Sequence, residues 1–92
     1  MLVVEKTQQP EALLKVLAKN GVYPILETLR RNPQRFSQLM FAARLNPGIL
    51  DRHLKSLMHI EAIEKNGDVY VLTNRGHRLI SVLHNLLDLY SE

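Results

Sequence analysis

Residues 46–57 read NPGILDRHLKSL, and this stretch decides the fold. Asn46 is a favourable N-cap and Pro47 suits the first position of a helix, so a helix is predicted to begin here. Leucines recur at i, i+4 and i+7, which gives this helix one narrow apolar face. The remaining positions are predicted to point wholly or partly outward: Gly48, Ile49, Asp51, Arg52, His53, Lys55 and Ser56.

Upstream of this stretch, a three-residue break at 44–46 separates it from another predicted helix. That helix carries Leu39, Met40 and Ala43 on one side, and the Ser37 hydroxyl is expected to cap its start. Two earlier helices are predicted. One spans residues 11–19, opened by Pro10, and the other runs from about residue 23 to the Arg30-Arg31-Asn32 run, where the following proline ends it.

Downstream, the period of the hydrophobic pattern changes to two, which indicates strands on either side of Asn66-Gly67. This dipeptide favours a type I′ turn, in which both central residues have positive φ, so a two-stranded hairpin is predicted. Thr73 is expected to cap a final helix running to about Tyr90. Its apolar residues cover more than one face, which favours burial against a second chain: Leu79, Ile80, Val82, Leu83, Leu86, Leu87, Leu89 and Tyr90.

The net charge of the chain is +3, and its distribution is uneven. Residues 30–55 contain six lysines or arginines and a single acidic residue, Asp51, whereas the flanking segments are neutral or acidic. A basic stretch that coincides with two helices joined by a short turn, with a hairpin directly behind them, is the plan of a winged helix-turn-helix. The charge therefore points to the phosphate backbone of DNA as a partner.

Length and composition limit the alternatives. With 92 residues, 46% of them hydrophobic and 23% charged, the chain is expected to form one folded domain over residues 1–92. We divide it into an N-terminal arm and helix (1–21), a winged-helix core (22–73) and a C-terminal dimerisation helix (74–92). The absence of cysteine, of a signal peptide and of a long apolar run predicts a cytoplasmic protein without a membrane partner.

The stretches RFSQLMFAARLNPGILDRHLKSL (35–57) and EAIEKNGDVYVLTNRGHRLI (61–80) resemble the winged-helix transcriptional regulators of the MarR and HxlR type. The resemblance includes the pattern Tyr70-x-Leu72-Thr73-x-x-Gly76 at the end of the hairpin. It implies a mainly helical α+β fold, a winged helix-turn-helix with a small β-hairpin and extra helices at both ends. It also implies a short strand at 35–37 before the first helix of the motif.

The chain departs from the family pattern in four places. Arg44 stands where these regulators often have the glycine of the turn, and Glu61 stands where a glycine commonly ends the recognition helix. The hairpin connection is short, which limits the reach of the wing. The cysteine used by redox-sensing members is missing, so that mode of control does not carry over.

The predicted function is sequence-specific binding of double-stranded DNA by a transcriptional regulator. The recognition helix (46–59) would enter the major groove and the wing (63–70) would lie at the backbone. Candidate contacts to base edges are Gly48, Ile49, Asp51, Arg52 and Lys55. Candidates for backbone and flanking contacts are Arg35, Ser37, Arg44, Asn46, His53 and Lys65.

Asp51 and the four histidines each have a second interpretation. Asp51 would either accept a hydrogen bond from cytosine or pair with Arg52 or Lys55. The four histidines show no pair at i, i+4 spacing on one helix and no cysteine accompanies them, so no metal site is predicted. The chain also lacks phosphate-binding glycine loops and hydrolase motifs, so we predict no catalytic residues, no cofactor and no enzymatic activity.

The sequence favours a homodimer held by the final helix, through Leu79, Val82, Leu83, Leu86, Leu87, Leu89 and Tyr90. A two-fold pair of recognition helices would read a pseudo-palindromic site with half-sites about 34 Å apart. Two alternatives stay open: a winged helix that binds an acidic protein, and an architectural chromosomal protein without site preference. The sequence does not identify a small-molecule effector.

Overall fold

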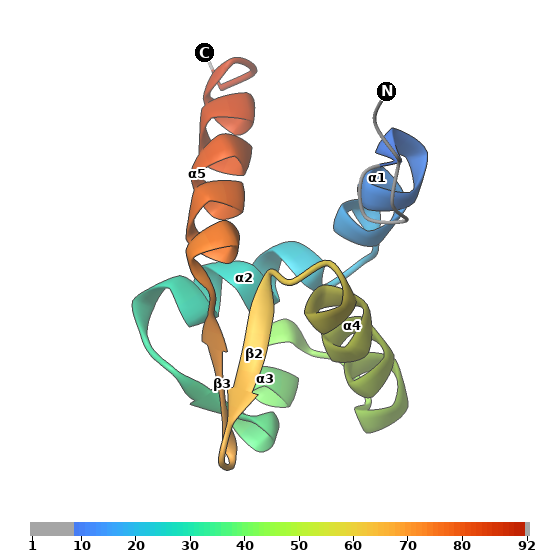
Figure 1. Cartoon of the computed structure of the whole chain (residues 1–92), viewed down its shortest axis with the longest axis vertical. Helices are drawn as coiled ribbons and strands as arrows, with labels where there is room; N and C mark the ends of the chain where they lie inside the picture. Colours follow the sequence, from blue (N-terminus) through green and yellow to red (C-terminus); the bar gives the residue numbers. More distant parts are fainter. Residues whose placement is uncertain (1–8, 92) are drawn as a thin grey trace, which may run out of the picture.

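A computed structural model describes residues 9–91, so the part of the predicted N-terminal arm at 1–8 lies outside the described residues. The chain is helical except for a small sheet (Figure 1). The elements are α1 (Pro10–Ala18), α2 (Val22–Arg31), β1 (Gln34–Arg35), α3 (Phe36–Ala43), α4 (Pro47–His59), β2 (Ile63–Asn66), β3 (Val69–Leu72) and α5 (Asn74–Asp88).

The helix-turn-helix consists of α3 and α4, and the start of α3 differs from the prediction. Ser37 does not cap this helix, because the helix begins at Phe36, two residues earlier than a Ser37 cap predicts. The N-cap is Arg35, whose backbone N–H donates to Gln38 Oε1 at 2.8 Å. In a capping box, the side chain of a Gln three residues after the N-cap accepts a hydrogen bond from the N-cap N–H. Gln38 makes this bond at the start of α3, where the sequence predicted a hydroxyl cap from Ser37. The expected strand at 35–37 accordingly ends at Arg35.

The turn between α3 and α4 confirms the predicted three-residue break. Arg44 adopts the left-handed conformation, with φ 57°, that a glycine would adopt more readily. Asn46 caps α4 as predicted, accepting a hydrogen bond from the Ile49 amide at 2.9 Å. Leu45 is buried and lies against Gly21, which has φ 93°, and a Cβ at Gly21 would be only 2.6 Å from Leu45 Cδ1. A side chain at residue 21 would therefore displace Leu45 and strain the backbone.

The sheet has three antiparallel strands in the order β1-β3-β2, so the short strand implied by the family resemblance joins the predicted two-stranded hairpin. β1 pairs with β3 through Gln34 opposite Tyr70. The predicted turn at Asn66-Gly67 is wrong by one residue, because Asn66 pairs with Val69 and leaves Gly67 and Asp68 as the loop. Of the two loop residues, Gly67 has positive φ but Asp68 does not, so the type I′ requirement is not met.

The core lies where α2, α3, α4 and the sheet meet. The three leucines of α4 are at most 1% exposed, which confirms the narrow inner face predicted for this helix. α1 contributes no fully buried residue. The buried hydrophobic residues are Val22, Ile25, Leu26, Leu29, Leu39, Ala43, Leu45, Leu50, Leu54, Leu57, Ile60, Ala62, Ile63, Tyr70, Leu72 and Ile80.

The final helix begins as predicted and ends slightly earlier than expected. The Thr73 side chain accepts from the Gly76 amide at 3.0 Å, and α5 continues to Asp88. α1 and α5 both project from the side of the core opposite the tip of the hairpin (Figure 1). Within the described residues, no helix combines the length and apolar character needed to cross a membrane.

Candidate nucleic-acid interface

The outward face of α4 is the centre of the candidate interface. Because the three buried leucines occupy one side of the helix, the opposite arc carries Gly48, Arg52 and Lys55, all of them exposed. The side chain of Arg52 forms no ion pair within residues 9–91. Its guanidinium is therefore available for a base edge or a phosphate.

Asp51 and Lys55 form an ion pair on the surface of α4, with Lys55 Nζ 2.9 Å from Asp51 Oδ2. The two residues are one helical turn apart, and both side chains are more than half exposed. Such exposed i, i+4 pairs contribute only about 0.3–0.5 kcal/mol, so DNA could displace this one at small energetic cost. The pair matches one of the two alternatives for Asp51.

Two predicted DNA contacts, Ile49 and His53, lie on the side of α4 that faces α1. Ile49 is partly buried and packs against the core. His53 Nε2 lies 2.9 Å from the backbone carbonyl oxygen of Asn20, in the loop after α1. These side chains therefore position α1 against the recognition helix, and they are less exposed than Arg52 and Lys55.

The start of α4 and the adjoining turn present polar groups. Asn46 is exposed, but its side-chain oxygen already accepts from the Ile49 amide, which leaves the carboxamide N–H₂ for an external acceptor. Gly48 has only the Asn46 side chain near the position of a Cβ, at 3.6 Å. Arg44 and Ser37 are exposed and line one surface hollow beside Phe41. This arrangement gives backbone phosphates close access to the start of the helix.

The wing brings two predicted residues to the surface of the sheet. Lys65 is paired across the strands with Tyr70, and its Nζ lies 5.5 Å from the centre of that ring. Arg35 Nε lies 3.8 Å from Asp68 Oδ2 at the hairpin turn, with both side chains at least two-thirds exposed. The carboxylate of Asp68 partly offsets the charge of Arg35, and at this exposure the pair is weak.

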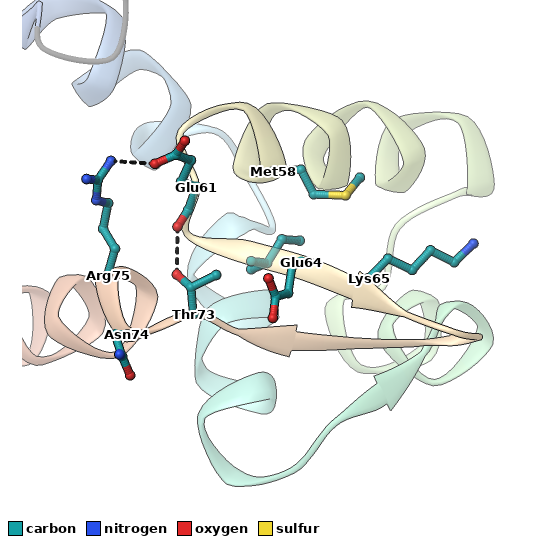
Figure 2. A pocket seen from close by; sticks show the side chains of 8 residues that line it. Met58, Glu61, Glu64, Lys65, Thr73, Asn74 and Arg75 are labelled. Atoms are coloured by element: carbon teal, nitrogen blue, oxygen red, sulfur yellow. Dashed lines mark hydrogen bonds and ion pairs between the residues drawn. The ribbon is translucent and has the colours of Figure 1, made fainter.

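A junction at Glu61 connects the recognition helix to the wing and to α5 (Figure 2). Glu61 has φ 64°, so it takes the left-handed conformation expected of a helix-ending glycine. Its carbonyl oxygen accepts from Thr73 Oγ1 at 2.6 Å, and its carboxylate lies 3.1 Å from Arg75. Figure 2 shows the side chains of Thr73 and Arg75 directed at Glu61 while Lys65 extends towards the hairpin tip. These bonds fix the wing relative to α4.

Glu27 removes part of the positive charge that the sequence places in residues 30–55. Its carboxylate lies 2.8 Å from Arg30, 3.8 Å from Arg31 and 2.7 Å from His84 Nε2 on α5. The hydrogen bond from Arg30, followed by that from His84, lowers the pKa of Glu27 from 4.5 to about 2. The same contact raises the pKa of Arg30. Arg30 and Arg31 thus belong to a structural cluster on α2.

Sequence reasoning did not include two lysines of α1 in the interface. Lys15 and Lys19 line a groove between α1 and α4, together with Arg52 and His53. Lys15 lies within α1 and Lys19 is its C-cap residue. Their i, i+4 spacing in the sequence gives no sign that they lie beside the recognition helix. Only the packing of α1 on α4 brings them there.

The predicted dimerisation residues fall into two groups. Leu79 and Leu83 are partly buried and pack against the core of their own chain. The other five are exposed: Val82 59%, Leu86 49%, Leu87 49%, Leu89 70% and Tyr90 83%. Leu14 on α1 is also 62% exposed. Within residues 9–91, no group of three or more His, Asp or Glu side chains is arranged to hold a metal ion.

An exposed basic recognition helix, a capped turn and a hairpin fixed beside them define a winged helix-turn-helix protein. A family model described as winged helix-turn-helix matches residues 13–91, and the chain belongs to this family. It is similar to an uncharacterized HTH-type transcriptional regulator of Methanocaldococcus jannaschii, with 35% identity over 80 residues that cover 77% of this chain and 75% of that protein. The resemblance to winged-helix regulators inferred from the sequence is thereby confirmed.

Two solved structures have a similar fold. Quinone-bound YodB from B. subtilis has a TM-score of 0.76 at 26% identity, with 87% of this chain and 92% of that chain covered. A homodimeric winged helix-turn-helix DNA-binding domain from Mycobacterium bovis has a TM-score of 0.67, with 86% of this chain and 84% of that chain covered. At 21% identity, the second likeness concerns the fold alone.

Proposed function

We propose that this protein is a sequence-specific regulator of transcription that binds double-stranded DNA as a homodimer and acts in the cytoplasm without enzymatic activity. The observation that carries the proposal is the exposed arc of α4, where Arg52 and Gly48 lie opposite the buried leucines and beside the capped helix start. A helix with such a face fits the major groove, and an exposed arginine suits the N7 and O6 acceptors of guanine.

The remaining predicted contacts divide by position. Asn46, Arg44 and Ser37 are assigned to backbone phosphates at the helix start, and Lys65 and Arg35 to phosphates at the wing. Gly48, Arg52 and Lys55 are assigned to base edges. We assign Ile49 and His53 to the contact between α4 and α1, because both are partly buried there.

The dimer is proposed from the exposed apolar side chains of α5 and α1. Five apolar side chains in the second half of α5 and directly after it, together with Leu14 of α1, are at least 49% exposed. Both helices project from the same side of the core (Figure 1), so a second copy could cover both. A two-fold arrangement would direct two recognition helices to half-sites about 34 Å apart.

The test is a titration of labelled duplex DNA by fluorescence anisotropy at several salt concentrations, on a site obtained by selection from random duplexes. We expect affinity to fall with a log–log slope of about −0.9 for each phosphate neutralised. Replacing Arg52 by Ala should reduce the free energy of binding to the selected site by about 1–3 kcal/mol. The exposed Arg78 on α5 provides a matched control, because R78A removes the same charge outside the interface.

The outcomes separate the three candidate functions. Selection of one site with a large loss in R52A supports the regulator. Tight binding without site preference would indicate an architectural protein, and the absence of binding at about 50 mM salt would indicate a module that binds another protein. An equal effect of R52A and R78A would remove Arg52 from the base contacts.

A further inference from the structure

The charged side chains that line the groove between α1 and α4 are all positive. Three cationic side chains line it: Lys15 from α1, Lys19 from the C-cap of α1, and Arg52 from α4. Among the described residues that line it, none is acidic. Its apolar wall includes Val16 and Ile49, both partly buried in the packing of the two helices. The rim of the groove is therefore a local concentration of positive charge.

The ion pairs of the chain show that this concentration is not neutralised from within residues 9–91. Five of the described lysines and arginines form ion pairs: Arg30, Arg31, Arg35, Lys55 and Arg75. Six form none within that range: Lys15, Lys19, Arg44, Arg52, Lys65 and Arg78. Half of these six cations therefore surround one groove. An uncompensated cluster of this kind attracts a polyanion.

The two sides of the groove are held together. The hydrogen bond between His53 Nε2 and the Asn20 carbonyl oxygen joins the end of α1 to the middle of α4 at 2.9 Å. Ile49 adds apolar contact at the start of the same face. Consequently, when α4 enters a DNA groove, the lysines of α1 are brought with Arg52 towards the sugar-phosphate backbone.

We infer that Lys15 and Lys19 bind backbone phosphates of the DNA that α4 recognises, so that α1 is a third DNA-binding element beside the recognition helix and the wing. The inference rests on the proposed function. Ammonium groups on flexible stems suit phosphate but do not read base sequence, so these contacts add affinity on every duplex and leave site preference unchanged.

The experiment measures the salt dependence of binding for the full chain carrying K15Q and K19Q, singly and together. Each phosphate that is no longer neutralised should reduce the magnitude of the log–log slope by about 0.9 per protomer, and selected and random duplexes should weaken by the same factor. R78Q is the matched control, since it removes one exposed positive charge of α5 that lies outside the groove. K15R/K19R keeps the charge and should retain the slope of the unmodified protein.

A second measurement uses the unmodified protein and does not depend on the folding of a variant. Amine acylation followed by mass spectrometry compares the modification of Lys15 and Lys19 with and without duplex DNA. Both amines should be protected by DNA. Unchanged reactivity, or a K15Q/K19Q slope equal to that of R78Q, would overturn the inference. If the unmodified chain binds no duplex, the proposed function fails instead, so the two failures are distinguishable.

Discussion

Gly76 occupies the point where α5 meets the junction between α4 and β2, and replacing it by alanine tests the packing of the whole motif. A Cβ at this position would fall against the backbone carbonyl oxygen of Ala62, with the Leu72 side chain at 3.0 Å. The Ala62 oxygen cannot rotate away, because it accepts a hydrogen bond from the Thr73 amide at 3.0 Å. G76A must therefore displace α5 from the sheet.

The size of the effect follows from three contributions. Overpacking a buried site typically costs about 1–3 kcal/mol, and weakening the hydrogen bonds that Thr73 makes with Ala62 and Glu61 costs about 1 kcal/mol each. The helix preference of alanine over glycine returns about 0.5–1 kcal/mol. We expect a net loss of about 2–4 kcal/mol in the free energy of unfolding. For a domain of this size, that lowers Tm by about 10–30 °C.

The assay is thermal and urea unfolding followed by circular dichroism, at one fixed protomer concentration because a dimer couples stability to concentration. Gly48 supplies the matched control. A Cβ there meets only Asn46 Oδ1 at 3.6 Å, so G48A should leave Tm unchanged or raise it by a few degrees. The same variant should weaken DNA binding, because its methyl group lies on the face assigned to the major groove. A G76A protein as stable as the unmodified chain would refute the reasoning.

Three further predictions use the same stability and association measurements. Glu61 has φ 64°, and its carboxylate forms only an exposed ion pair with Arg75. E61G should therefore raise the free energy of unfolding by about 0.5–1 kcal/mol. A lower free energy of unfolding for E61G in urea melts would contradict this. The pKa of Glu27 is lowered in the folded state to about 2, so its stabilisation is complete above the unfolded pKa near 4.5 and is lost as pH falls towards 2. E27Q should therefore show a flatter dependence of the urea midpoint on pH between these values, and parallel curves would argue against the cluster. Leu86 is 49% exposed at the proposed dimer face, and L86K should raise the dissociation constant of the dimer by tenfold or more in sedimentation velocity, whereas an unchanged constant would place the interface elsewhere.

Much of the fold was predictable because its signals are local. The cap and proline at 46–47, the leucine spacing of α4 and the threonine cap of α5 each act within a few residues, and each is confirmed. The errors also have local causes. Ser37 and Asn66-Gly67 are strong signals by residue type, but Gln38 accepts the backbone N–H of the actual N-cap, Arg35, and the two-residue loop begins at Gly67, one residue later than predicted. A two-residue strand has no detectable period, so the third strand is expected only from the family resemblance, and its predicted bounds of 35–37 differ from the observed Gln34–Arg35.

The left-handed conformations at Arg44 and Glu61 show how the tertiary structure overrides residue preference. Neither residue favours positive φ, and each stands where the resemblance to winged-helix regulators predicts glycine. The chain keeps the turn because Leu45 is buried against Gly21, and it keeps the helix end because the Glu61 carbonyl bonds to Thr73. Packing and hydrogen bonding between distant segments exceed the strain of about 1–2 kcal/mol per residue that the left-handed backbone imposes.

The order of the elements, the inner face of α4 and the winged helix-turn-helix class are all encoded locally in the chain, because periodicity and capping depend on neighbouring residues. The concentration of positive charge in residues 30–55 is likewise a property of the sequence. Which of those charges are free depends only partly on neighbours in sequence. Glu27 pairs with Arg30 and Arg31 within α2, whereas Asp68 reaches Arg35 only through the pairing of β1 with β3, and only the packing of α1 on α4 places Lys15 and Lys19 beside Arg52. Charge summed along a chain ignores contacts between segments, and electrostatic interaction depends on distance in space.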